Sequence, residues 1–126
     1  MDKKRPVNLD LGTIALPITS YVSILHRVSG VIMFFAVAVL LWLLESSLAS
    51  EASFNELSDL FNNPLCQIIV WGTLAALAYH SVAGMRHMIM DFGVGEDSFY
   101  AGRLSAWAAL ALAAVVIALI TLWVFL

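Results

Sequence analysis

The chain has 126 residues, of which 62% are hydrophobic and only 12% are charged. Soluble domains average about 45–50% apolar and about 25% charged residues, so the composition excludes an ordinary soluble protein. The net charge of −3 comes without the basic stripe or recognition module of a nucleic-acid-binding protein. A single cysteine, Cys66, excludes an intrachain disulfide, and we expect it to be a small packing residue near a helix start.

Three uncharged stretches, residues 28–44, 60–85 and 104–126, approach or exceed the ~17–25 residues that cross a hydrocarbon core. We therefore predict an all-α integral membrane protein with three transmembrane helices, at about residues 20–47, 64–90 and 102–126. The connectors are too short to form a soluble domain that binds a flavin or a nucleotide. Any catalysis must then be shared with partner chains, and we expect the three helices to be part of a larger bundle.

Residues 1–19 form an N-terminal segment without a helical period, flanked by Pro6 and Pro17. The segment either docks onto a soluble partner or is a frayed tail. Because proline is accepted at or before a helix start but not inside a helix, we expect the first helix to begin near Ser20.

A polar cluster follows at the start of the first helix. Ser23 and Arg27 are four residues apart and share one helix face, with His26 and Gly30 on the neighbouring face. A hydroxyl beside a guanidinium can hydrogen-bond a quinone carbonyl and stabilise negative charge as the quinone is reduced. Arg27 could equally pair with a haem propionate or snorkel to lipid phosphates, and His26 alone would be an interfacial residue.

Basic residues lie on one side of this topology, whereas the first connector carries only acidic ones. The basic residues are Lys3, Lys4, Arg5, Arg27, Arg86 and Arg103, and the acidic ones are Glu45, Glu51, Glu56 and Asp59. The positive-inside rule then predicts a cytoplasmic N-terminus and second connector, with the first connector and the C-terminus outside.

The second helix has a defined start, with Asn63 as the expected N-cap and Pro64 at the first helical position. His80 lies sixteen residues after Pro64, about 24 Å along the helix. Ionisable groups at membrane depth are costly and tend to be functional.

Small residues share the face of His80, namely Gly72, Ala76 and Gly84. Such a groove suits a flat macrocycle whose metal the imidazole reaches. It equally suits the close approach of another helix. On the residues alone, both interpretations stay open.

Arg86, His87 and Asp91 form a third cluster at the cytoplasmic end of the second helix. His87 is ~10.5 Å beyond His80, so one haem iron cannot take both, and we expect His87 to be interfacial. Arg86 and Asp91 are expected to pair with each other or with partners. The third helix, rich in Ala, Leu and Val, reads as a generic lipid-facing span. No motif for an iron–sulfur cluster, zinc or a nucleotide is found.

Four segments together closely resemble the cytochrome b556 subunit of bacterial succinate dehydrogenase. They are Arg5-Pro6-Val7-Asn8-Leu9-Asp10-Leu11, Pro17-Ile18-Thr19, the SxxHRxSG pattern from Ser23 to Gly30, and Ala78-Tyr79-His80 followed by Gly84-x-Arg86-His87-Met88-x-Met90-Asp91-Phe92-Gly93. The resemblance covers residues 5 to 95.

The resemblance implies a multi-pass anchor in the bacterial inner membrane that is not catalytic alone. It would pair with a second small hydrophobic subunit and dock an iron–sulfur subunit and a flavoprotein. Succinate would be oxidised in the flavoprotein, and electrons would pass along the iron–sulfur clusters. Ubiquinone would be reduced where these clusters meet the anchor.

The resemblance also implies residue roles. His80 would be an axial ligand of haem b, with Gly84 and Ala76 packing against the haem. Ser23 and Arg27 would line the quinone site, and His26 would lie with Arg27 near the haem propionates. Because a six-coordinate b-type haem needs two axial ligands and His80 is the histidine well inside the bilayer, the second ligand is expected from the partner subunit.

Three alternatives stay open. The chain could anchor a quinol:fumarate reductase running the reverse reaction, or belong to a small proton-conducting transporter in which His80 relays protons. It could also be a purely structural anchor without a cofactor.

Overall fold

The computed structural model describes residues 7, 9, 10, 12–95 and 97–126. These fold into four helices, α1 (Ile18–Ala49), α2 (Glu51–Leu60), α3 (Pro64–Asp91) and α4 (Phe99–Phe125), and the described part contains no strand. Helices α1, α3 and α4 are each long and apolar enough to cross a membrane. The predicted all-α membrane architecture with three spans is therefore confirmed.

Helix α1 starts at Ile18, directly after Pro17, and so begins slightly earlier than predicted. It ends at Ala49 because Ser50 adopts an extended backbone. The Ser50 hydroxyl then accepts a hydrogen bond from the Ser53 amide at 3.0 Å and caps the next helix. A single residue thus ends one helix and starts another.

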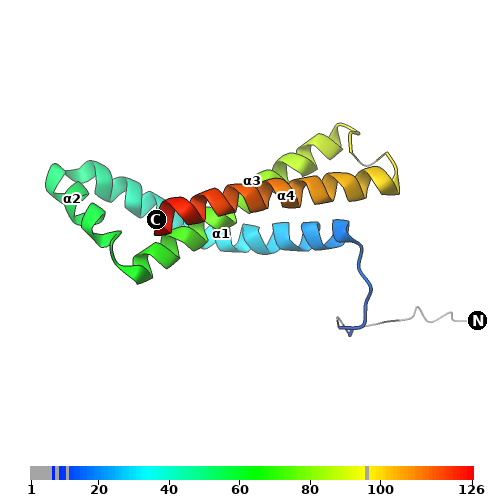
Figure 1. Ribbon diagram of the computed structural model, residues 1–126, viewed down its shortest axis with the longest axis horizontal. Helices are drawn as coiled ribbons and strands as arrows, with labels where there is room; N and C mark the ends of the chain where they lie inside the picture. The colour runs from blue at the N-terminus through cyan, green and yellow to red at the C-terminus, as the bar shows by residue number, and fades with distance from the viewer. Residues whose placement is uncertain (1–6, 8, 11, 96) are drawn as a thin grey trace, which may run out of the picture.

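Helix α2 was missed by the sequence analysis, which treated residues 48–63 as a connector. Its side toward the bundle is held by the buried Leu57 and by the Ser53 hydroxyl, which donates to the Ser46 carbonyl of α1 at 2.7 Å. Figure 1 shows α2 at one end of the molecule. The N-terminal end of α1 and the connector between α3 and α4 lie at the opposite end.

Helix α3 starts as predicted. The Asn63 side chain accepts from the Leu65 amide at 2.9 Å and the Cys66 amide at 3.4 Å, and Pro64 follows the cap. The helix ends at Asp91, where Gly93 takes up a left-handed backbone with φ of 81°.

Helix α4 starts at Phe99, earlier than the predicted residue 102. The Ser98 hydroxyl caps it by accepting from the Ala101 amide at 3.1 Å. One face of α4 consists of small buried residues at spacings of four, three and four: Gly102, Ala106, Ala109 and Ala113. This face packs closely on the other helices, so α4 is not the uniformly lipid-facing span that its composition suggested.

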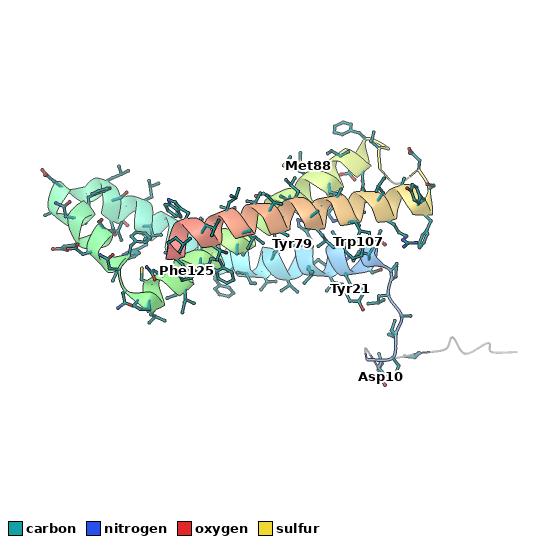
Figure 2. All side chains as sticks on the ribbon, viewed as in Figure 1. Asp10, Tyr21, Tyr79, Met88, Trp107 and Phe125 are labelled. Atoms are coloured by element: carbon teal, nitrogen blue, oxygen red, sulfur yellow. The ribbon has the colours of Figure 1, made fainter. Side chains whose placement is uncertain are left out.

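Helix α3 packs against both α1 and α4. The centre of this packing is the contact among Val22 of α1, Ala83 of α3 and Ala106 of α4. Large apolar side chains cover the outside of the bundle. Met88 and Trp107, for example, both labelled in Figure 2, are more than half exposed. Such a surface suits lipid or further transmembrane helices.

Candidate functional site

His80 lies where α3 meets α1, and two groups of α1 hold its ring. The Nδ1 atom is 3.0 Å from the Ser29 hydroxyl and 3.3 Å from the His26 carbonyl oxygen. A Cβ atom built on Gly30 would lie 3.3 Å from the ring carbon Cε1. The glycine therefore lets the α1 backbone approach the imidazole closely.

The three histidines of the chain come together in one row. The His26 ring stacks on the His80 ring with a centroid distance of 4.3 Å and an interplanar angle of 17°. The His87 ring lies 5.0 Å from His26 on a tilt of 37°. The sequence analysis expected His87 to be interfacial and His26 to lie near the haem propionates, and it did not foresee that the two rings meet. The seven-residue spacing of His80 and His87 does place them on one face of α3.

Nδ1 of His80 is the one ring nitrogen of this row with a hydrogen bond to the described chain, and the two Nε2 atoms of His26 and His80 differ in burial. Nε2 of His26 is buried and makes no hydrogen bond. Nε2 of His80 also makes none with the described residues, but it is not fully buried and part of it faces the outside of the chain. Buried polar atoms are normally paired, and such an exception calls for an explanation.

Gly84 and Ala76 have different surroundings. A Cβ atom on Gly84 would lie 3.5 Å from Nε2 of His26, an ordinary van der Waals distance, so Gly84 lies beside that ring. Ala76 is half-buried one turn before His80, and a Cβ on Gly72 would meet no atom within 4 Å. Packing of Gly84 and Ala76 against a haem remains a prediction.

Ser23 and Arg27 lie one turn apart on α1 and flank the position of His26 in sequence. Ser23 is half-buried and Arg27 is exposed. No hydrogen bond or ion pair joins either side chain to the part of the protein that the structure describes. Both side chains are available to a group outside this chain.

Arg86 has a structural role that the sequence analysis did not foresee. It is 7% exposed, and it donates from Nε to the Ser105 hydroxyl at 3.1 Å and from Nη2 to the Gly102 carbonyl at 3.3 Å. No ion pair connects it with Asp91, which is exposed. The expected intrachain pair between them is absent from the described residues, and Arg86 instead ties α3 to α4.

A second polar residue that the sequence analysis did not assign is Tyr79, whose hydroxyl donates to the Val22 carbonyl at 2.9 Å. This bond fixes α3 against α1 one residue before His80. Its position beside the histidine was the only signal in the sequence, and nothing there indicated the partner.

No group of three or more His, Cys, Asp or Glu side chains among the described residues is placed to hold a metal ion. An imidazole nitrogen that is free of hydrogen bonds is the kind of protein ligand that a haem iron takes. The ring nitrogens of His87 are also without a hydrogen bond in the described chain, so His80 is distinguished by its contacts to α1. The accessible Nε2 of His80, with the glycine backbone of α1 against the ring, fits this requirement.

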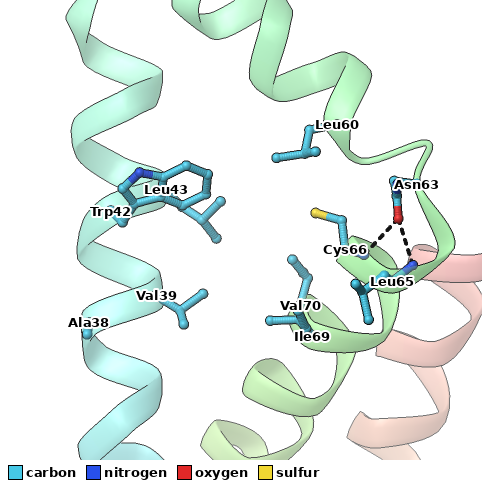
Figure 3. A pocket seen from close by; sticks show the side chains of 10 residues that line it. All are labelled: Ala38, Val39, Trp42, Leu43, Leu60, Asn63, Leu65, Cys66, Ile69 and Val70. Carbon is cyan, nitrogen blue, oxygen red and sulfur yellow. Dashed lines mark hydrogen bonds between the residues drawn. The ribbon is translucent and has the colours of Figure 1, made fainter.

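A cavity of about 520 Å³ lies away from the histidines, between α1, α2 and α3 (Figure 3). Its walls are mostly apolar and include Trp42, Leu60 and Ile69. Cys66 is half-buried in this wall, in agreement with the packing role expected for it. The cavity is separate from the residues predicted to bind haem or quinone.

Comparison with known proteins decides the family. Residues 1–120 match the family described as succinate dehydrogenase/fumarate reductase transmembrane subunit. The chain belongs to this family. It is therefore a multi-pass membrane subunit of that class, as the three long apolar helices also indicate.

Several relatives in this family carry the name succinate dehydrogenase cytochrome b556 subunit. The protein from Coxiella burnetii is 37% identical over 99% of this chain and 100% of its own length. The one from Paracoccus denitrificans is 32% identical over 96% of this chain and 92% of its own length. The one from Rickettsia felis is 36% identical over 82% and 80%. The resemblance drawn from the sequence motifs is thus confirmed.

Proposed function

We propose that this chain is the membrane anchor of a succinate:ubiquinone oxidoreductase, that it binds haem b through His80, and that it contributes Ser23 and Arg27 to the site of ubiquinone reduction. The observation that carries the proposal is the state of the His80 ring. Nδ1 is engaged by α1, whereas Nε2 has no partner in the described chain and is accessible. The names of the relatives from three bacteria support the same reading.

Haem b, when bound, supplies a one-electron carrier within the membrane. His80 would hold its iron through Nε2. Nε2 of His26 is buried within the described chain, so His26 is a poorer ligand for an external group than His80. The second ligand would come from a second small hydrophobic subunit. That subunit would cover the α1–α3 face, from which Nε2 of His80 would be reached.

Ser23 and Arg27 would act on the quinone. The Ser23 hydroxyl can donate a hydrogen bond to a quinone carbonyl, and the Arg27 guanidinium can stabilise the negative charge that develops on that oxygen. Neither side chain has a hydrogen bond or ion pair with the described residues, which supports this role. His26 and Arg27 would also lie near the haem propionates, where a cation and an imidazole donor suit two carboxylates.

The proposed setting is the bacterial inner membrane, with the N-terminal segment, residues 1–19, in the cytoplasm and the C-terminus in the periplasm. The start of α1 and the α3–α4 connector lie at one end of the bundle and α2 at the other (Figure 1), as the charge pattern requires. The iron–sulfur subunit and the flavoprotein would dock at the cytoplasmic end. The role of residues 1–6, 8 and 11 in that docking falls outside the described residues.

The haem assignment is tested by expressing the chain with its partner subunits and recording dithionite-reduced minus oxidised spectra of the membranes. We expect a b-type band in the native protein, its loss or shift in His80→Leu, and its retention in the matched control His87→Leu. An unchanged band in His80→Leu would remove the ligand role from His80. Rates of succinate-to-quinone and quinol-to-fumarate transfer by the same membranes establish the favoured direction.

A further inference from the structure

Ser29 is the residue of α1 that touches His80 most directly, and it is itself buried at 5% exposure. Its hydroxyl oxygen lies 2.7 Å from the His26 carbonyl oxygen and 3.0 Å from Nδ1 of His80. The hydroxyl thus bridges a backbone carbonyl of α1 and an imidazole of α3.

The chemistry of these contacts determines where the protons lie. A carbonyl oxygen can only accept, so the short contact to His26 requires the Ser29 hydroxyl to donate its proton there. The lone pairs of the same oxygen are then directed to Nδ1 of His80, which must carry a proton to complete the second bond.

A second contact leads to the same assignment independently. Nδ1 of His80 is 3.3 Å from the His26 carbonyl oxygen, which again can only accept. In the opposite arrangement, Ser29 would donate to an unprotonated Nδ1. The lone pair of Nδ1 would then face a lone pair of the His26 carbonyl oxygen across 3.3 Å. This arrangement would also leave the shorter 2.7 Å contact without a proton.

In a neutral imidazole only one nitrogen carries a proton, so Nδ1–H leaves the lone pair on Nε2. We infer that Ser29 is the positioning residue that holds His80 in the Nδ1–H tautomer and orients its Nε2 lone pair outward as the haem ligand. This inference rests on the proposed function. It gives a physical role to Ser29 and Gly30, the Ser-Gly pair that ends the first motif, since Gly30 admits the ring that Ser29 orients.

Groups that hydrogen-bond the second nitrogen of a ligating histidine fix the ring and raise its basicity, and their loss typically weakens binding by about 10- to 100-fold. Ser29→Ala leaves Nδ1–H with only the longer contact to the His26 carbonyl. We therefore expect the haem midpoint potential to rise, because a less basic imidazole stabilises oxidised iron less well. Loss of haem to an excess of a haem-scavenging protein should accelerate by about tenfold or more.

The experiment compares four variants in the assembled complex, by redox titration of the haem band and by the rate of haem loss. Ser29→Thr keeps the hydroxyl and should restore both values. Ser47→Ala is the matched control, because the Ser47 hydroxyl makes the same bond to a carbonyl three residues earlier, 2.8 Å to Leu44, with no histidine nearby. It should leave both values native. Where Ser29→Ala does not accumulate, Ser29→Cys, with a weaker acceptor of similar size, should give a smaller shift in the same direction.

Native potential and native haem retention in Ser29→Ala, or in Ser29→Cys where that variant replaces it, would overturn the inference. His80→Leu, measured in parallel, separates this failure from that of the proposed function. If His80→Leu loses its haem and the changes at Ser29 have no effect, only the positioning role of Ser29 is wrong. If His80→Leu keeps its haem, both the ligand role of His80 and the positioning role of Ser29 are wrong.

Discussion

The two faces of α3 bury polar groups in different ways. Toward α4, no buried polar side-chain atom of the described residues lacks a partner: Arg86 donates to Ser105 and to the Gly102 carbonyl, and Trp71 donates from Nε1 to the Thr121 hydroxyl at 2.8 Å. Toward α1, Nε2 of His80 and Nε2 of His26 have no partner in the described chain. The first face closes its polar contacts within the chain, whereas on the second face we propose that Nε2 of His80 takes a partner from another molecule.

The difference also extends to side-chain size. The small residues of α4, with Ala106 fully buried at 0% exposure, let the helices approach closely on one side of α3. On the other side, imidazole rings fill the space between α1 and α3. Substitutions should therefore separate into two classes, those that change binding or electron transfer and those that change only stability.

The largest effect on function is expected from Arg27→Ala at the end of the α1–α3 face. Loss of a cation that stabilises developing negative charge should lower quinone reductase activity of the assembled complex by about 100-fold. The haem band should remain. Arg103→Ala, which removes another exposed arginine, serves as the control and should stay near native activity. Native activity in Arg27→Ala would contradict the quinone role.

On the α3–α4 face, Arg86→Ala should cost about 3 kcal/mol of stability, because two hydrogen bonds from a charged donor are lost. Thermal unfolding of the purified complex in detergent measures this. Arg86→Lys should recover only part of the loss, since one ammonium group cannot reproduce the forked contact to Ser105 and Gly102. A native transition in Arg86→Ala would show that this tie does not hold the two helices.

Close packing of the same face is tested by Ala106→Leu. The larger side chain must displace Val22 or Ala83, at a cost of about 1–3 kcal/mol. Ala114→Leu is the matched control, because Ala114 is exposed on the same helix. Equal stability of the two variants would argue that α4 does not pack through its small residues.

The smallest effect is expected from Trp71→Phe. It removes the hydrogen bond to Thr121 and should cost about 0.6 kcal/mol, the average for such bonds between transmembrane helices. Trp42→Phe, at a half-exposed tryptophan of α1, provides the comparison. Thr121→Val should match Trp71→Phe, and the double variant should add little to either, because both remove one bond.

Much of this architecture could be predicted from the sequence. The lengths of the three uncharged stretches predicted the three membrane spans. The start of α3 was predicted from the Asn63-Pro64 pair, because a helix cap depends only on local residues. Helix α2 was missed because its ten residues lack a long apolar run. The Ser50 cap and Leu57 were the available signals. The spacing of the small residues in α4 also indicates a packing face, formed by Gly102, Ala106, Ala109 and Ala113. It was missed because the whole helix is rich in small and apolar residues.

The row of histidines could not be predicted, because it depends on how α1 crosses α3. Helical spacing puts His80 and His87 on one face of α3, but no local rule brings His26 of α1 between them. The same holds for Ser29 with His80 and for Arg86 with Ser105, since each contact joins residues from different helices. The residue pattern along one helix predicts which side chains share a face. Contacts between two helices can be predicted only when the packing of those helices is known.

The central claim is that the α1–α3 face binds haem while the α3–α4 face only holds the bundle together. The most direct test is the haem content per complex of His80→Leu and Arg86→Ala, purified side by side with the native complex. The account predicts little or no haem in His80→Leu, and native haem content in whatever Arg86→Ala complex survives purification. Equal losses of haem in both variants would contradict it.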